Sequence, residues 1–236
     1  MIWRWLICSS VSLALAAAAT VSGEVELTNS KDANVRKRRD YSGVVLWLEP
    51  KDRAAQPPAV KRVDMLQKDK QFQPHVMAIS VGSTVDFPNL DLIFHNAFSN
   101  FSGQPFDVGL YPPHTSRNVT FKHPGIVRVF CNIHSTMSAI IAVLNTPWYA
   151  VSAPNGKYTI ANVPPGEYQL RLFHERARPD NLKFLEHPVT VPESGLAMPL
   201  ISISETGYNP EPHLNKYGTS YPPAANDGTY PGAPKK

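Results

Sequence analysis

Residues 126–144 read IVRVFCNIHSTMSAIIAVL, and this stretch decides the fold. A β-branched run at 126–130 and an apolar run at 139–144 enclose a tight loop, which predicts two neighbouring strands. Successive side chains of a strand point to opposite faces, so Cys131 lies on the same face as the two valines of the first run. Cys131 is therefore predicted to point into the interior at the end of its strand.

The loop carries Cys131, His134 and Met137, spaced Cys-x-x-His-x-x-Met. A thiolate, an imidazole and a thioether suit copper far better than magnesium or calcium, which prefer oxygen ligands. Two His and one Cys with a weak axial Met form the type 1, or blue, copper site of electron transfer, so a second His is needed. His95 is the candidate. Zinc could bind the same thiolate and imidazoles, but a thioether contributes little to a zinc site. The sequence thus predicts one type 1 copper ion.

The first residues have the features of a secretory signal peptide, with Arg4 near the start, an apolar run and then small residues. Cleavage after Ala19 or after Gly23 fits the pattern, and a retained membrane anchor is the alternative. Cys8 leaves with the signal peptide, so the mature chain keeps the single thiol of Cys131 and can form no internal disulfide. Metal binding explains this thiol. We therefore expect a periplasmic or secreted protein.

Short strands separated by turn signals about every 8–12 residues predict an all-β protein. The C-terminal tail at 205–236 is rich in Tyr, Pro and Gly without apolar periodicity, which predicts disorder. A tail that contacts a partner or a surface is the alternative.

We expect two β-sandwiches, of which the first binds the metal. The strand at 43–48 could join the second sandwich, so that the metal-binding sandwich would be inserted between this strand and the rest of the second. The expected segments are a signal peptide (1–23), an N-terminal linker and strand (24–60), a copper domain (61–146), a second small β-sandwich (147–204) and a disordered tail (205–236).

Three motifs of the segment at 61–146 indicate a family: Val-Gly-Ser-Thr-Val at 81–85, the pair His95-Asn96, and the ligand loop at 130–137. In these motifs the segment resembles the cupredoxins, the plastocyanin and amicyanin group, and the short loop is of the amicyanin type. The resemblance implies a cupredoxin-like Greek-key β-sandwich. It also implies the copper ligands. Met137 would be the axial ligand, and the equatorial ligands would be His95, Cys131 and His134.

The same resemblance implies roles for residues around the metal. It implies that the backbone N–H of Asn96 donates to the sulfur of Cys131 and that the Asn96 side chain ties the two ligand loops together. We also expect His134 to be the ligand nearest to solvent. The sequences at 155–160 and 163–168 carry turn signals between short strands, and in them the second sandwich resembles the carboxypeptidase regulatory-like, or prealbumin-like, module.

We therefore expect an exported one-electron carrier whose redox partner proteins dock near His134. A copper-sequestering protein and a structural β-module with incidental redox activity are the alternatives. An oxidase is not expected, because Phe130 and Asn132 flank Cys131 in place of the His pair that passes electrons to a trinuclear copper cluster. The net charge of +4 is too small to indicate nucleic-acid binding. No stable membrane insertion is expected after signal cleavage.

Overall fold

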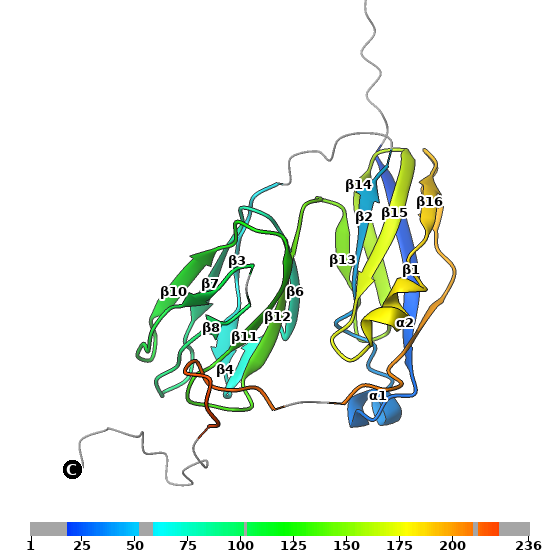
Figure 1. Cartoon of the computed structure of the whole chain (residues 1–236). Helices are drawn as coiled ribbons and strands as arrows, with labels where there is room; N and C mark the ends of the chain where they lie inside the picture. Colours follow the sequence, from blue (N-terminus) through cyan, green and yellow to red (C-terminus); the bar gives the residue numbers. More distant parts are fainter. Residues whose placement is uncertain (1–17, 52–58, 102, 210–211, 222–236) are drawn as a thin grey trace, which may run out of the picture.

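The computed structural model describes residues 18–51, 59–101, 103–209 and 212–221. These residues form two β-sandwiches that lie side by side, with two short helices (Figure 1). Residues 19–50 lie in one sandwich, residues 62–144 form the other, and residues 149–204 return to the first. The predicted all-β fold with two sandwiches is confirmed. Among the described residues, no helix is long and apolar enough to cross a membrane.

The ligand sandwich, as we call the unit that carries the predicted ligands, is built from ten strands: β3 (Arg62–Asp64), β4 (Leu66–Lys68), β5 (Gln71–Gln73), β6 (Val76–Ser80), β7 (Thr84–Pro88), β8 (Phe98–Ser99), β9 (Phe106–Asp107), β10 (Ser116–Thr120), β11 (Gly125–Phe130) and β12 (Ser138–Leu144). One sheet has the order β10-β7-β3 and the other the order β6-β12-β11-β8-β9, while β4 pairs with β5. β11 is antiparallel to β12, so the loop between them is the tight connection that the sequence predicts.

The flanking sandwich, as we call the other unit, contains β1 (Ala19–Thr28), β2 (Val45–Pro50), β13 (Tyr149–Val151), β14 (Lys157–Val163), β15 (Gly166–Phe173), β16 (Pro188–Val191), β17 (Leu196–Ala197), β18 (Ile201–Ser204) and the helices α1 (Ala33–Arg38) and α2 (Pro179–Lys183). One sheet has the order β14-β1-β17, with β18 also on β1, and the other has the order β13-β2-β15-β16. The strand expected at 43–48 is β2, which pairs with β13 and β15. The ligand sandwich is therefore inserted in the chain between β2 and β13.

Strand β12 is buried on both faces, which explains its unbroken apolar sequence. Ile141 and Val143 pack into the core of the ligand sandwich. Ile140 and Leu144, on the opposite face, join Val45 of the flanking sandwich in a separate apolar cluster. This cluster joins one sheet of each sandwich, so the two units share an apolar interface.

The segment at 24–60 is predicted to begin with a linker, and this prediction is wrong for its first part, because β1 runs to Thr28 and α1 follows. β1 is antiparallel to β14 and parallel to β17 and β18. Asp32 caps the start of helix α1, because its carboxylate accepts hydrogen bonds from the N–H groups of Asn34 and Val35. Its last turn is basic, which suits the helix dipole, and Val35 is buried against the flanking core.

β1 also includes residues 19–23, which belong to the predicted signal peptide if cleavage follows Gly23. Val21 is fully buried and pairs with Ile160 of β14 and Leu196 of β17. Cleavage after Ala19 would leave these pairs in place, whereas cleavage after Gly23 would remove them. Residues 1–17, with the rest of the predicted signal peptide, lie outside the described residues.

The prediction of a disordered tail from residue 205 is wrong for residues 205–209 and 212–221. Glu205 is buried and accepts hydrogen bonds from three groups: His174 Nε2 (2.9 Å), Arg176 Nε (3.0 Å) and Ser30 Oγ (2.6 Å). Residues 212–221 contact the ligand sandwich. The segment packs through polar and aromatic groups, so the apolar periodicity used in the prediction is absent there. Residues 222–236 lie outside the described residues.

Candidate metal centre

His95, Cys131 and His134 converge at one end of the ligand sandwich. One ligand atom from each lies within 4.8 Å of the other two, and among the described residues no other group of three His, Cys, Asp or Glu side chains does so. Cys131 Sγ is 3.9 Å from His95 Nδ1 and 3.7 Å from His134 Nδ1. The two imidazole rings lie 4.9 Å apart, with an angle of 64° between their planes. A nitrogen of each ring thus faces the same thiol.

The burial of these side chains agrees with the sequence pattern of β11. Cys131 is fully buried and lies in the same core cluster as Val127 and Val129, so it points inward as predicted. His95 is also fully buried, whereas His134 is partly exposed. Of the two imidazoles, His134 is the one nearer to solvent.

Backbone hydrogen bonds make the loop after β11 compact. The N–H of Cys131 donates to the carbonyl of Met137 at 3.1 Å, and the N–H of Met137 donates to the carbonyl of His134 at 3.0 Å. Met137 is fully buried in the same core cluster as Cys131. The spacing of the motif therefore lets both sulfur-containing side chains enter the core while His134 stays near the surface. The role of Met137 as the axial ligand stays a prediction.

His95 is held by backbone and side-chain contacts that leave one nitrogen for a metal. Its N–H donates to the carbonyl of Tyr111 and its carbonyl accepts from the Tyr111 N–H, so the two residues form an isolated antiparallel bridge. Its Nε2 lies 2.7 Å from Asp91 Oδ2. A carboxylate only accepts, so Nε2 carries the proton and Nδ1 presents its lone pair toward Cys131. Asp91 is itself fixed by two backbone N–H groups, at 2.7 and 2.9 Å.

The electrostatics of the site favour neutral imidazoles. Burial lowers the pKa of His95, although the neighbouring Asp91 opposes the shift. Burial, together with the positive charge that a protonated His95 would carry, lowers the pKa of His134 to about 4. Both rings are therefore neutral at pH 7 and can each offer a lone pair to a cation.

The thiol of Cys131 experiences opposing effects. Burial raises its pKa, while the backbone N–H groups of Ile133, Asn96 and His134 lower it. The N–H groups favour a thiolate, and a metal cation at the same place would favour it further. The hydrogen bond from the Asn96 N–H to the sulfur that the resemblance implies stays a prediction.

Asn96 joins the two parts of the chain that carry the ligands. Its side-chain oxygen accepts from the N–H of Asn132 at 3.3 Å, next to Cys131. Its side-chain nitrogen donates to Asp107 Oδ1 at 2.7 Å and to the carbonyl of Gly109 at 3.0 Å. The tie between the ligand loops that the resemblance implies is thus present.

The donor set fits copper: one buried thiol that can ionise and two neutral imidazoles, with the thioether of Met137 in the adjoining core. The structure brings together three of the predicted ligands: His95, Cys131 and His134. The prediction does not include Asp91, although a carboxylate four residues before a candidate ligand His is a recognisable signal. Nor does it include a contribution of residues 212–221 to the site, for which the sequence gives no such signal.

No family model matches the chain, and no curated protein matches it. Solved structures match parts of it, and the three described next have TM-scores below 0.5. A copper-containing nitrite reductase from Thermus scotoductus SA-01 is 28% identical over 41% of this chain, with a TM-score of 0.34, and the match spans 25% of that enzyme. A purple cupredoxin from Nitrosopumilus maritimus is 24% identical over 32% of this chain and 84% of its own, with a TM-score of 0.30. Amicyanin from Paracoccus versutus is 20% identical over 39% of this chain and 86% of its own, with a TM-score of 0.33.

Proposed function

We propose that this chain binds one copper ion as a type 1 site and acts as an exported one-electron carrier. The observation that carries the proposal is the convergence of two imidazole nitrogens on a buried, unpaired thiol within 4.8 Å. The proposed ligands are His95, Cys131 and His134, with Met137 as a weak fourth. The proposed location is periplasmic or secreted.

Copper, when bound, supplies the Cu(I)/Cu(II) couple. The protein holds the ligands so that both oxidation states are accommodated with little movement. Asp91 fixes the ring of His95, and the compact loop from Cys131 to Met137 fixes the thiolate and the thioether. The backbone N–H groups around the sulfur stabilise the thiolate, and burial excludes water from it. These features favour fast electron exchange over substrate chemistry, so we propose a carrier and not an enzyme.

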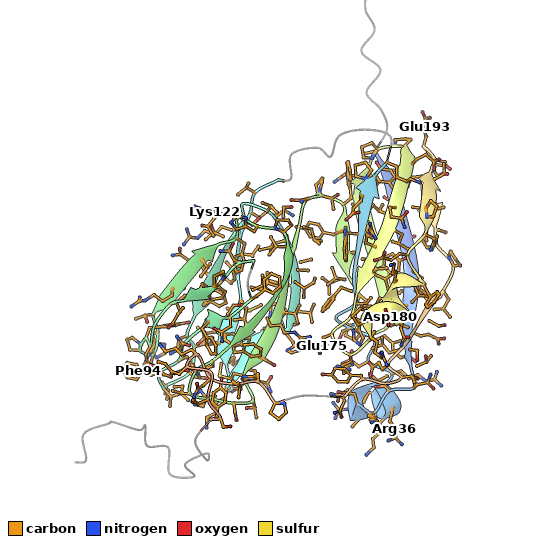
Figure 2. All side chains as sticks on the ribbon, in the orientation of Figure 1. Arg36, Phe94, Lys122, Glu175, Asp180 and Glu193 are labelled. Atoms are coloured by element: carbon orange, nitrogen blue, oxygen red, sulfur yellow. The ribbon has the colours of Figure 1, made fainter. Side chains whose placement is uncertain are left out.

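Four exposed apolar side chains lie in the loops next to His95 and its bridge partner Tyr111. We call this set the apolar patch: Leu90, Leu92, Phe94 and Leu110. Figure 2 shows Phe94 at the end of the ligand sandwich opposite Lys122. Together with the partly exposed His134, this patch suits a small and transient contact with a redox partner protein. We propose that partners dock there.

The visible spectrum of the protein loaded with Cu(II) tests the proposed site. We expect an intense blue thiolate-to-copper band that is absent from the Cys131→Ser variant, because the serine hydroxyl does not replace the thiolate. Met77→Leu, a change of a buried methionine in β6, is the control and should keep the band. A wild-type protein without the band would contradict the copper site. Slow self-exchange of electrons in a protein that has the band would contradict the carrier role and favour copper sequestration.

A further inference from the structure

Residues 212–221 lie against the loop that carries the proposed ligands. Figure 1 shows this segment, in orange and red, at the lower end of the ligand sandwich beside β11. Two of its residues, Lys216 and Tyr221, make direct hydrogen bonds to Asn132 and Cys131. The contacts join residues more than 80 positions apart in the sequence, with separations of 84 and 90.

Lys216 closes a ring of hydrogen bonds around the two ligand-bearing segments. Its N–H donates to Asn132 Oδ1 at 3.0 Å, and its ammonium group donates to Asp107 Oδ2 at 2.7 Å. Asp107 also accepts from the side chain of Asn96, whose oxygen accepts from the N–H of Asn132. Asn96 follows His95 and Asn132 follows Cys131, so the ring ties together the neighbours of two proposed ligands. The ammonium–carboxylate bond is charge-assisted and is the strongest type of contact in the ring.

Tyr221 and His213 hold the end of β11 from the same side. The hydroxyl of Tyr221 donates to the carbonyl of Cys131 at 2.8 Å and accepts from His213 Nδ1 at 3.2 Å. The imidazole of His213 stacks on the ring of Phe130, with centroids 4.0 Å apart and 24° between the planes. One proposed ligand and the residue before it are therefore both fixed by the returning segment.

We propose that residues 212–221 form a clasp that positions the metal ligands, with Lys216 and Tyr221 as its positioning residues. The inference rests on the proposed metal site, because its purpose is to hold the Cys131 and His95 segments at a fixed separation. The hydrogen bonds of the two residues reach the backbone of Cys131, the side chain of Asp107 and the side chain of Asn132, so the clasp acts through these groups. With the clasp in place, the loop that carries Cys131 moves less when copper changes its oxidation state.

The first test uses the metal-free, full-length protein and amide hydrogen exchange. The double variant Lys216→Met/Tyr221→Phe keeps the shape of both side chains but removes the ammonium group and the hydroxyl. We expect the amides of Cys131 and Asn132 to exchange about tenfold faster, because the bond of the ammonium group to Asp107 and the bonds of the hydroxyl to Cys131 and His213 are lost. The control is Lys122→Met/Tyr149→Phe, which makes the same chemical changes at the far end of the ligand sandwich and in β13. Exchange equal to that of the control would overturn the clasp.

The second test loads the same proteins with copper and measures release to a Cu(I) chelator. Changes to groups that orient metal ligands weaken metal binding about 10- to 100-fold, so we expect copper to leave the clasp variant at least about tenfold faster than the control. We also expect its thiolate band to move or broaden. Release at the wild-type rate with an unchanged band would overturn the clasp. A wild type that takes up no copper would refute the proposed function, and the exchange comparison in metal-free protein would then still decide whether the clasp holds the loop.

Discussion

Asp91 decides which nitrogen of His95 faces the thiol. Its carboxylate binds Nε2, and two backbone N–H groups hold that carboxylate in place. Without this acceptor, the proton of a neutral His95 is free to occupy Nδ1, the atom that lies 3.9 Å from Cys131 Sγ. Asp91 is therefore an orienting residue for a proposed ligand.

We predict that Asp91→Ala lowers copper affinity about 10- to 100-fold, which is the usual cost of removing a partner that orients a metal ligand. Competition with a chelator of known affinity measures the change. Asp64→Ala, which removes an exposed carboxylate from β3, is the matched control. Equal affinities for the two variants would show that Asp91 does not orient His95.

For single residues, the sequence predicts a shared site best where the side chains are chemically distinctive. Cys131, His134 and His95 were identifiable because few side chains bind soft metals, and their spacing limits where they can lie. Lys216 and Tyr221 could not be identified, because lysine and tyrosine in a Pro-rich segment are common and only the folded chain brings them to the ligand loop.

Among the elements, strand β1 is difficult to predict because its first residues overlap the predicted signal peptide. Its first residues continue the apolar run of the predicted signal peptide, yet Ala19 and Val21 are buried in the flanking core. The later residues alternate, with Val25 and Leu27 buried, which is the pattern of a half-buried strand. The polar and charged residues within and after this strand favour the prediction of a linker in place of a strand.

We predict that a chain beginning at Glu24 is less stable than a chain beginning at Ala19. The shorter chain loses the burial of Val21, about 1.5–3 kcal/mol, and several backbone pairs with β14 and β17. Urea unfolding of both proteins measures the difference. Equal free energies of unfolding would mean that residues 19–23 contribute nothing to the flanking sandwich.

The sequence of β12 predicts both a strand and its burial on two faces. A strand with one solvated face alternates polar and apolar residues, whereas residues 139–144 are apolar throughout. The absence of alternation indicates burial on both faces, and the structure has an apolar cluster on each side of this strand. The partner that covers the second face is distant in sequence and cannot be predicted from the strand alone.

The whole molecule is held together by apolar and ionic contacts between the sandwiches. Beside the apolar cluster, His75 at the start of β6 lies against Glu175, with Nε2 2.9 Å from the nearer carboxylate oxygen. Its Nδ1 lies 3.0 Å from the carbonyl of Ser138, the residue after Met137. Figure 2 shows Glu175 on the side of the flanking sandwich that faces the ligand sandwich. This contact therefore links the flanking sandwich to the end of the ligand loop.

The link should depend on pH. The hydrogen bond with Glu175 raises the pKa of His75 above its ordinary value of 6.5, against burial and the charge of Arg176, and the pKa of Glu175 lies below 4.5. A raised His pKa contributes stability that is complete below pH 6.5 and disappears as the pH rises through the folded-state value. A lowered Glu pKa contributes stability above pH 4.5 that disappears as the pH falls. The link is therefore strongest between about pH 5 and 6.5.

We predict that the free energy of unfolding of the wild type exceeds that of His75→Gln by a margin that shrinks between pH 6 and pH 9. The margin should stay below about 1 kcal/mol, because the imidazole is half exposed and solvent screens the pair. Urea unfolding at several pH values measures it. A margin that is constant over this range would exclude the ion pair as its source.

The central claim is that His95, Cys131 and His134 hold one copper ion, and X-ray absorption at the copper edge of the loaded protein tests it most directly. The account predicts one sulfur and two imidazole nitrogens in the first coordination shell, with the sulfur lost in Cys131→Ser and one imidazole lost in His95→Ala. A first shell of oxygen atoms only, unchanged in both variants, would contradict it.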